Sequence, residues 1–339
     1  MSATETRHIG SPLKRKEDDP LLRGRGTFVD NIALPGTLAM AVVRSPYAHA
    51  RIVSIDTSAA KAAAGVVDVF TGADLRDDWK AAMPCAWPVT EDMKNPEHFP
   101  LAVAEAHYQG DGVVVVLADT RAHAADAAEL VEVEYEPLPV IVDVAAAADD
   151  GAPLVHEELG TNVSYVWKLE TGTFEEDADV VVKHTYYQPP LIPNAMEPRG
   201  VVARPEPGGD VTLWSATQVP HILRLLAAAT LGMSETKLRV IAPDVGGGFG
   251  SKLDVYAEEL LAVALARRLG RPVKWIEERS ENAVSTIHGR DFVTMLELAA
   301  TKDGKITSLR ANVHASMGAY LQLVTPGIPL LGAWIYAGP

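Results

Sequence analysis

The fold is indicated most strongly by the stretch APDVGGGFGSKLD, residues 242–254. The segment 237–241 predicts a strand before it, and the apolar pattern over 253–269 predicts a long helix after it. Glycines at 246, 247, 248 and 250 allow positive φ and let a ligand approach the backbone closely. Unpaired N–H groups at a helix N-terminus favour oxygen anions. The stretch therefore predicts an anion or cofactor cradle between a strand and a helix, with a structural tight turn as the alternative.

Two familiar nucleotide-binding motifs do not fit this glycine cluster. A phosphate-binding P-loop requires Gly-Lys-Ser/Thr, whereas Lys252 follows Ser251 and precedes Leu253. The dinucleotide fingerprint requires a third glycine five positions after the first, where Ser251 and Leu253 stand instead. A nucleotide-binding enzyme that holds phosphate with this loop stays open as a hypothesis, although the spacing of the glycines argues against it.

Composition excludes several classes of partner and site. The 339 residues include 45 acidic and 30 basic side chains, a formal charge of −15, which argues against nucleic acid as the main partner. The single cysteine, Cys85, excludes an intrachain disulfide and a cysteine-ligated iron–sulfur or zinc cluster built by this chain alone. No spacing of His, Cys and carboxylate residues is typical of a zinc site.

The ends of the chain carry no targeting signal that we recognise. The first twenty residues lack an apolar segment of the signal-peptide type, which together with the lone cysteine suggests the cytoplasm. The apolar run 321–339 is interrupted by prolines and glycines, so we expect no transmembrane segment. Its last residues, LLGAWIYAGP, are expected to be covered by further polypeptide.

The hydrophobic pattern predicts an α/β or α+β fold in two domains, 20–145 and 155–339, of which the α+β class is the one that we expect. In the first we expect strands at 38–43, 50–55, 66–70, 113–117 and 130–135, and helices at 58–65 and 120–130. The continuous apolar run 113–117 is typical of a strand buried on both faces. The Pro- and Ala-rich stretch 136–153 predicts a connector.

The second segment predicts a sheet, two helices and a hairpin. We expect strands at 162–169, 178–187, 200–204, 210–215, 237–241 and 273–277, and helices at 222–232 and 253–269. Strands 292–300 and 306–315 flank Asp303-Gly304, a strong hairpin signal.

Beyond these patterns, the chain resembles the molybdopterin-binding large subunits of the xanthine dehydrogenase, aldehyde oxidase and carbon monoxide dehydrogenase family. The motifs are colinear: 23–60 and 126–143, similar to the a/b hammerhead domain, then NAMEPRGVVA (194–203), WSATQ (214–218), GGGFGSK (246–252) and EERSENAVSTIHGRD (277–291). The resemblance implies a hammerhead domain followed by the first, incomplete part of a molybdopterin-binding domain.

The resemblance assigns a small set of cofactor-binding residues. Gln218 matches a glutamine that hydrogen-bonds an oxygen ligand of molybdenum, and Gly247, Gly248, Phe249 and Gly250 match a loop whose backbone N–H groups face the metal ligands. No protein side chain is expected to bind the metal directly. Taken alone, Gln218 would be an ordinary strand-end residue and Phe249 a core aromatic.

Other polar residues receive a structural interpretation. Glu197 and Arg199 are expected to form a buried charge pair. Packing or hydrogen bonding, and not catalysis, is the interpretation for the remaining candidates: His107, His123, His288 and Arg290.

The family also implies cofactors and partners. These are molybdenum-molybdopterin, in the cytosine dinucleotide form common in bacterial members, with [2Fe–2S] clusters on a small subunit and FAD on a medium subunit. The general-base glutamate of the family is expected beyond Pro339, so no catalytic residue is assigned within the chain. Three explanations stay open: a fragment, a split subunit completed by a second polypeptide, or a non-catalytic remnant.

Two functional hypotheses follow. In the first, the chain is part of a hydroxylase that oxidises a small molecule, namely an aldehyde, an N-heterocycle or carbon monoxide, with water as oxygen source and transfer of electrons to the Fe–S and FAD subunits. In the second, the chain acts only in subunit assembly.

Overall fold

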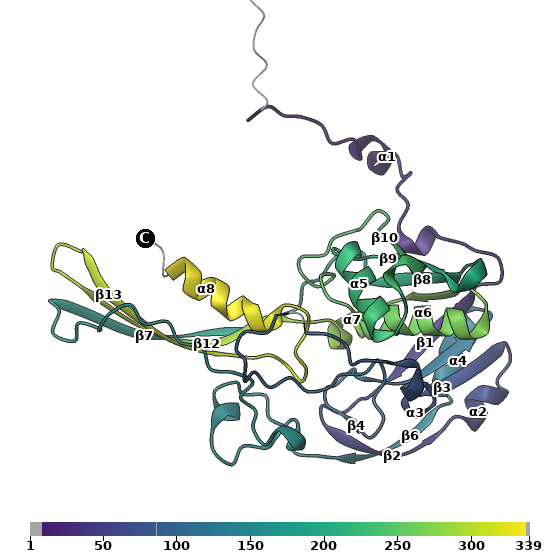
Figure 1. Ribbon diagram of the computed structural model, residues 1–339, viewed down its shortest axis with the longest axis horizontal. Helices are drawn as coiled ribbons and strands as arrows, with labels where there is room; N and C mark the ends of the chain where they lie inside the picture. Colours follow the sequence, from purple (N-terminus) through teal and green to yellow (C-terminus); the bar gives the residue numbers. More distant parts are fainter. Residues whose placement is uncertain (1–8, 86, 337–339) are drawn as a thin grey trace, which may run out of the picture.

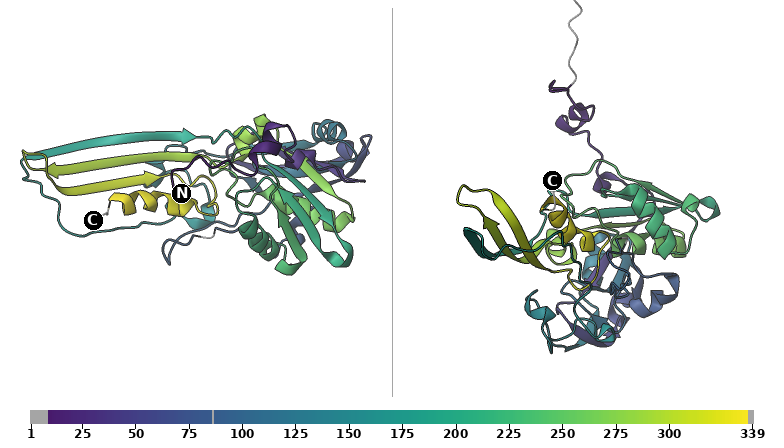
Figure 2. Two further views of the ribbon diagram at one scale, coloured as in Figure 1. Left: turned by 90° about the horizontal axis from the view of Figure 1, so that it is seen from above. Right: turned by 60° about the vertical axis from the view of Figure 1, so that its left-hand side comes forward.

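A computed structural model describes residues 9–85 and 87–336, with backbone only for 333–336. Figures 1 and 2 show a body that carries most helices and a long three-stranded arm that extends from it. A short N-terminal helix, α1 (Asp18–Leu22), projects away from the body. The described elements are therefore divided between a layered body and a single-layer arm.

The body is built on a mixed seven-stranded sheet. Its order is β10 (Leu238–Ile241), β9 (Val211–Ser215), β8 (Gly200–Pro205), β11 (Val273–Ile276), β1 (Leu38–Arg44), β5 (Gly112–Ala118) and β3 (Val66–Thr71). The pairs β9–β10 and β1–β11 are parallel, and the others are antiparallel. Strands from both predicted segments thus share one sheet, joined where Leu38 pairs with Val273.

Both faces of this sheet are covered, as the fully apolar strand β5 requires. On β5, Val115 and Leu117 belong to the larger core, while Val114 and Val116 face the opposite cluster. The larger core contains side chains of α3 (Gly72–Leu75), α5 (Pro220–Thr230) and α6 (Ala257–Leu269). The smaller contains side chains of α2 (Ser58–Ala62) and α4 (Arg121–Ala128). All residues of β5 are buried, as its sequence predicts.

A second small sheet lies beside the body. It has the order β4 (Glu105–Ala106), β2 (Ala50–Asp56) and β6 (Glu132–Pro137), all antiparallel. Ile52 and Tyr135, which pair across β2 and β6, pack against the smaller core. This sheet therefore closes the face that α2 and α4 begin to cover.

The arm is the antiparallel sheet β13 (Ile306–Ala315), β12 (Gly289–Ala300) and β7 (Val180–Leu191). The predicted hairpin at Asp303-Gly304 joins β12 to β13, and Gly304 has φ of 89°. Helix α8 (Ile328–Tyr336) lies beside the arm (Figure 1). No helix in the described part of the chain is long and apolar enough to span a membrane.

Three expectations fail locally. Residues 162–169 form no strand, because this segment joins no sheet and is held instead by the hydrogen bond from Lys94 N to Ser164 O, 2.8 Å. The long helix begins at Ala257 and not at Leu253, because residues 251–254 form turns. Helices α7 (Arg279–Ser285) and α8 were not expected. The apolar end at 337–339 lies outside the described residues.

Candidate cofactor site at the glycine loop

The topology of the sheet brings three separate segments to one edge. The glycine loop follows β10 and Gln218 follows β9, and these strands are parallel neighbours, so their carboxyl ends meet. Glu197 precedes β8, which is antiparallel to β9, so it reaches the same edge. Ligand sites occur commonly at the carboxyl ends of parallel strands. The edge thus carries the residues of the three motifs NAMEPR, WSATQ and GGGFGSK.

Gln218 is fixed against the glycine loop through its amide oxygen. Gly250 N donates to Gln218 Oε1 at 3.0 Å, and Lys252 N donates to the same oxygen at 3.3 Å. The backbone N–H of Gln218 donates to Lys252 O at 2.7 Å. Because the oxygen accepts from the loop, the amino group is the part of the amide that can donate to a ligand.

The loop presents three consecutive backbone N–H groups. Within the described residues, the N–H groups of Gly247, Gly248 and Phe249 donate to no protein acceptor. Positive φ angles at Gly247 (100°), Phe249 (53°) and Gly250 (93°) turn the backbone sharply around them. Successive N–H groups in such turns form concave anion-binding nests. Gly250 differs from the expectation, because its N–H is already bonded to Gln218.

Close packing explains why glycine occupies two loop positions. A Cβ on Gly248 would lie 2.4 Å from Gln218 Oε1, and a Cβ on Gly246 would lie 2.5 Å from Glu197 Cβ. An added Cβ on Gly250 would meet nothing within 4 Å, but its φ of 93° disfavours other residues. The glycines therefore serve both the turn and the close approach to Gln218 and Glu197.

A buried ion pair holds the two ends of the loop together. Glu197 Oε2 accepts from Gly246 N at 2.7 Å and from Lys252 Nζ at 2.9 Å. The Lys252 side chain is 1% exposed, and its burial lowers the pKa of the ammonium group although Glu197 opposes this. The sequence motif did not predict this anchoring role for Lys252, because the pairing depends on the sheet edge.

Arg199 and Glu197 are not paired with each other, which corrects the expectation. Arg199 instead binds Glu277 through Nη2 at 2.6 Å and Glu258 through Nη1 at 3.0 Å. Its guanidinium also lies 3.9 Å from the centre of the Tyr256 ring. Two Arg contacts, from Arg199 and Arg44, hold the pKa of Glu258 at about 2 although burial opposes this. The network is joined to the end of the loop through Tyr256, whose hydroxyl donates to Ser251 O.

Phe249 is the most exposed member of the loop. Its side chain is 76% exposed, so the alternative interpretation as a core aromatic is wrong, and its place in the cofactor loop stays a prediction. A non-glycine residue at positive φ is uncommon and is often found at functional positions. An exposed aromatic ring at this place is available to a bound group or to another polypeptide.

The helix N-terminus contributes nothing to the cradle, contrary to the sequence interpretation. Because α6 begins at Ala257, its first turn lies beyond the loop. Its N-terminal region holds its own carboxylates: Glu259 Oε2 accepts from Tyr256 N at 3.0 Å, and Glu258 is buried. The donors of the site are therefore loop N–H groups and not helix N–H groups.

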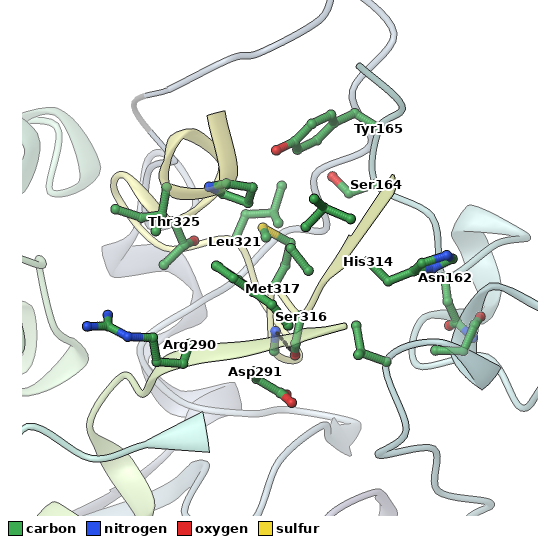
Figure 3. Close-up of a pocket in the computed structure, with 18 of the residues that line it drawn as sticks. Asn162, Ser164, Tyr165, Arg290, Asp291, His314, Ser316, Met317, Leu321 and Thr325 are labelled. Carbon is green, nitrogen blue, oxygen red and sulfur yellow. Dashed lines mark hydrogen bonds between the residues drawn. The ribbon is translucent and has the colours of Figure 1, made fainter. Parts of the chain in front are cut away.

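Within the described residues, three other candidates make no hydrogen bond to the glycine loop: His123, His288 and Arg290. His123 pairs with Asp119 on the surface, and His288 Nε2 lies 3.3 Å from Ala283 O. Arg290 lines a separate open cleft of about 2690 Å³ beside the arm, together with Tyr165, Ser316 and Met317 (Figure 3). Neither Gln218 nor the glycines 246–250 line this cleft.

Two family models match the chain in tandem. Residues 23–139 match the aldehyde oxidase and xanthine dehydrogenase a/b hammerhead domain, and residues 155–335 match the molybdopterin cofactor-binding domain. The second match spans more than half of the chain and includes Gln218 and the whole glycine loop. The class defined by fold and loop is thus a molybdopterin-binding protein. The chain belongs to the aldehyde oxidase and xanthine dehydrogenase family, to which carbon monoxide dehydrogenase large chains are also related.

Individual relatives agree with this assignment. The chain is 39% identical to the carbon monoxide dehydrogenase large chain of Afipia carboxidovorans, over 94% of this chain and 40% of that protein. It is 37% identical to the nicotine 6-hydroxylase large subunit of Paenarthrobacter nicotinovorans, over 92% and 38%. The quinoline 2-oxidoreductase structure from Pseudomonas putida 86 superposes with a TM-score of 0.85 at 37% identity, covering 91% of this chain and 39% of that one. The chain thus spans about 40% of the length of these relatives.

Proposed function

We propose that this chain is a large-subunit component of a molybdenum hydroxylase and that Gln218 with loop 247–250 forms part of its cofactor site. The observation that carries the proposal is the set of unpaired N–H groups at Gly247, Gly248 and Phe249 beside the oriented amide of Gln218. All are hydrogen-bond donors, which suits the oxygen ligands and phosphate oxygens of a molybdopterin group.

When bound, the molybdenum group supplies the redox chemistry by which water becomes the oxygen source for an oxidised substrate. Gln218 and the loop N–H groups would hold oxygen atoms of the group and fix its orientation. Glu197 and Lys252 would act indirectly, because their ion pair fixes the two ends of the loop. Phe249, exposed at the surface, would exclude water from one side of the bound group.

The finer features of the proposal come from the relatives. Carbon monoxide, nicotine and quinoline appear in the names of similar enzymes, and aldehyde oxidase in the name of the matched family. The proposed class of substrate is therefore an aldehyde, an N-heterocycle or carbon monoxide. Partners would be an Fe–S small subunit, an FAD-binding medium subunit and polypeptide that completes the large subunit. We further propose the cytosine dinucleotide form of the cofactor and a cytoplasmic location.

The first test is the metal and nucleotide content of the chain purified from its host with all co-purifying proteins. We expect about one molybdenum per chain, cytosine nucleotide, iron and FAD. A well-folded chain that carries no molybdenum would contradict the proposal. It would favour the alternative, a piece that acts only in subunit assembly.

A substitution tests the cradle itself. In Gly248→Ala the new Cβ would displace the Gln218 side chain, whose amide oxygen it would approach to 2.4 Å. We expect a more than tenfold loss of bound molybdenum with the folded state retained, because Gly248 does not require positive φ and Gln218 can move.

Gly172→Ala is the matched control, because an added Cβ there meets nothing within 4 Å and no positive φ is involved. Circular dichroism and size-exclusion chromatography report folding, and mass spectrometry of the metal reports loading. Equal molybdenum in the two variants would exclude Gly248 and Gln218 from the site.

A further inference from the structure

A cluster of imidazoles lies outside the glycine loop, at the edge of the small sheet. His49 and His107 stack with ring centres 5.2 Å apart, and His107 stacks on His156 at 4.2 Å. One ligand-type atom from each of His49, Glu105 and His107 lies within 4.8 Å of the others. The proposed cofactor function uses none of these residues.

Strand register produces this juxtaposition. In the pairing of β2 with β4, Ala50 faces Ala106 and Arg51 faces Glu105. One step further the same register sets His49 opposite His107. Glu105 is two residues before His107, and residues two apart along a strand share a face. Two histidines and a carboxylate therefore converge although His49 is distant in sequence, so residue spacing gave no sign of a metal site.

Backbone carbonyls orient both rings in the same way. His49 Nδ1 lies 3.0 Å from Pro139 O, and His107 Nδ1 lies 2.9 Å from Val155 O. A carbonyl only accepts, so each Nδ1 carries the proton and each Nε2 keeps its lone pair. Metal-binding histidines characteristically donate their other N–H to a carbonyl or carboxylate. Both rings are thus set as Nε2 ligands.

The Nε2 atom of His49 provides an independent sign of a missing partner. The His49 side chain is 8% exposed, and within the described residues this nitrogen has no hydrogen-bond partner. Glu105 Oε2 lies 3.8 Å away, too far for a hydrogen bond. A buried unsatisfied nitrogen is costly, and a cation between the imidazole and the carboxylate would satisfy both.

We propose that His49, Glu105 and His107 bind a divalent transition-metal ion, with zinc as the best-fitting ion. Two imidazoles and one glutamate are a known zinc ligand set, with bond lengths of about 2.0–2.2 Å. Ligand atoms in such a tetrahedral site are about 3.3 Å apart, so the cluster needs only a small contraction. Arg51 Nε lies 3.8 Å from Glu105 Oε1, the carboxylate oxygen that would not bind the metal ion.

His156 is not a ligand in this proposal. Its Nε2 lies 2.6 Å from Ala319 O and its Nδ1 lies 3.4 Å from Glu158, so both ring nitrogens face protein acceptors. The fourth ligand position is therefore left to solvent or to a small anion.

The position of the site suggests a structural role. The carbonyls that orient His49 and His107 belong to Pro139 and Val155, which are the last residue of the hammerhead match and the first of the cofactor-domain match. A bound ion would fix both ends of the 140–154 connector relative to β2 and β4. Zinc is thus expected to raise the melting temperature and to protect the connector from proteolysis.

The test is zinc binding to the full chain with its co-purifying proteins, after chelator treatment and dialysis. Titration with ZnCl2, followed by calorimetry and metal analysis, is expected to show one tight zinc per chain. Glu105→Gln preserves shape and removes the charge, and we expect it to weaken binding by at least the roughly 10–100-fold typical of outer-sphere changes. His107→Gln should do the same, which gives a second variant if either fails to fold.

His123→Gln is the control, because His123 is an exposed histidine paired with a carboxylate outside the cluster. It should bind zinc as the unmodified chain does. The proposal is overturned if the unmodified chain retains no zinc, or if Glu105→Gln and His107→Gln bind it with unchanged affinity. This readout does not depend on molybdenum, so it can fail or succeed independently of the proposed hydroxylase function.

Discussion

The seven-stranded sheet of the body and the three-stranded arm are made of similar β-forming sequence but are stabilised differently. In the body, every residue of β5 is buried between two layers of side chains. On the arm, Val182 and Tyr187 are 54% and 76% exposed, and almost all of β7 faces solvent. Body strands are thus held by packing, while the arm depends on its backbone ladder and on surface pairs such as Lys183–Glu297.

This difference teaches that β-branched sequence indicates a strand without indicating what covers it. A polar network lies inside the body, around Arg199, whereas the arm keeps its charges on the surface around Arg310. The same substitution should therefore have very different effects in the two regions.

Removal of the buried cation should give the largest effect. In Arg199→Met, the buried carboxylate of Glu277 would lose its cationic partner, and that of Glu258 would keep only Arg44. Breaking a buried pair in this way costs about 3–5 kcal/mol. Urea denaturation measures the free energy of unfolding, and Arg310→Met on the arm is the control, for which we expect no change outside experimental error. Equal losses in the two variants would break the comparison.

Truncation of one leucine in each region should give the next effect. Leu117 on β5 is fully buried in the larger core, so Leu117→Ala should cost about 2–5 kcal/mol. Leu309 on β13 is 41% exposed, so Leu309→Ala should stay within about 0.5 kcal/mol. Thermal and urea unfolding of both variants test this. A loss at Leu309 as large as that at Leu117 would show that another surface buries the arm.

The smallest expected effect is the change in the free energy of unfolding for each pH unit, which depends on Asp254. Burial raises the pKa of Asp254 to about 7, and within the described residues its Oδ2 has no hydrogen-bond partner. Between about pH 4 and pH 7 the folded chain keeps a proton that the unfolded chain releases. This contribution to stability is therefore full at low pH and is lost as pH rises towards 7, at a slope of at most about 1.4 kcal/mol per pH unit.

Asp254→Asn removes this titration. As pH rises from 5 to 8, the unmodified chain should lose free energy of unfolding that the variant keeps, so the difference between the two should grow in favour of the variant. Glu297→Gln on the arm is the comparison. Lys183 lowers the pKa of Glu297, so this carboxylate is ionised throughout that range and its replacement should add no slope. Parallel pH profiles for Asp254→Asn and the unmodified chain would contradict the assignment.

Much of the local structure follows from the sequence alone. Strand β5, the Asp303-Gly304 hairpin and the glycine loop after β10 lie where their patterns predict them, because burial period and turn chemistry are local properties. The family could also be predicted from the sequence, because its motifs occur in this chain in the family's order. The segment 162–169 was misassigned because a strand also requires a partner strand, which local pattern does not supply.

Only the tertiary structure decided which distant segments meet. The parallel pairing of β9 with β10 sets Gln218 against the glycine loop, and the β8 edge brings Glu197 to Lys252. Register between β2 and β4 likewise brings His49 to His107. The physical reason is that the sequence of a strand indicates which of its faces is buried. Which strands lie beside it in the sheet depends on the packing of the whole chain.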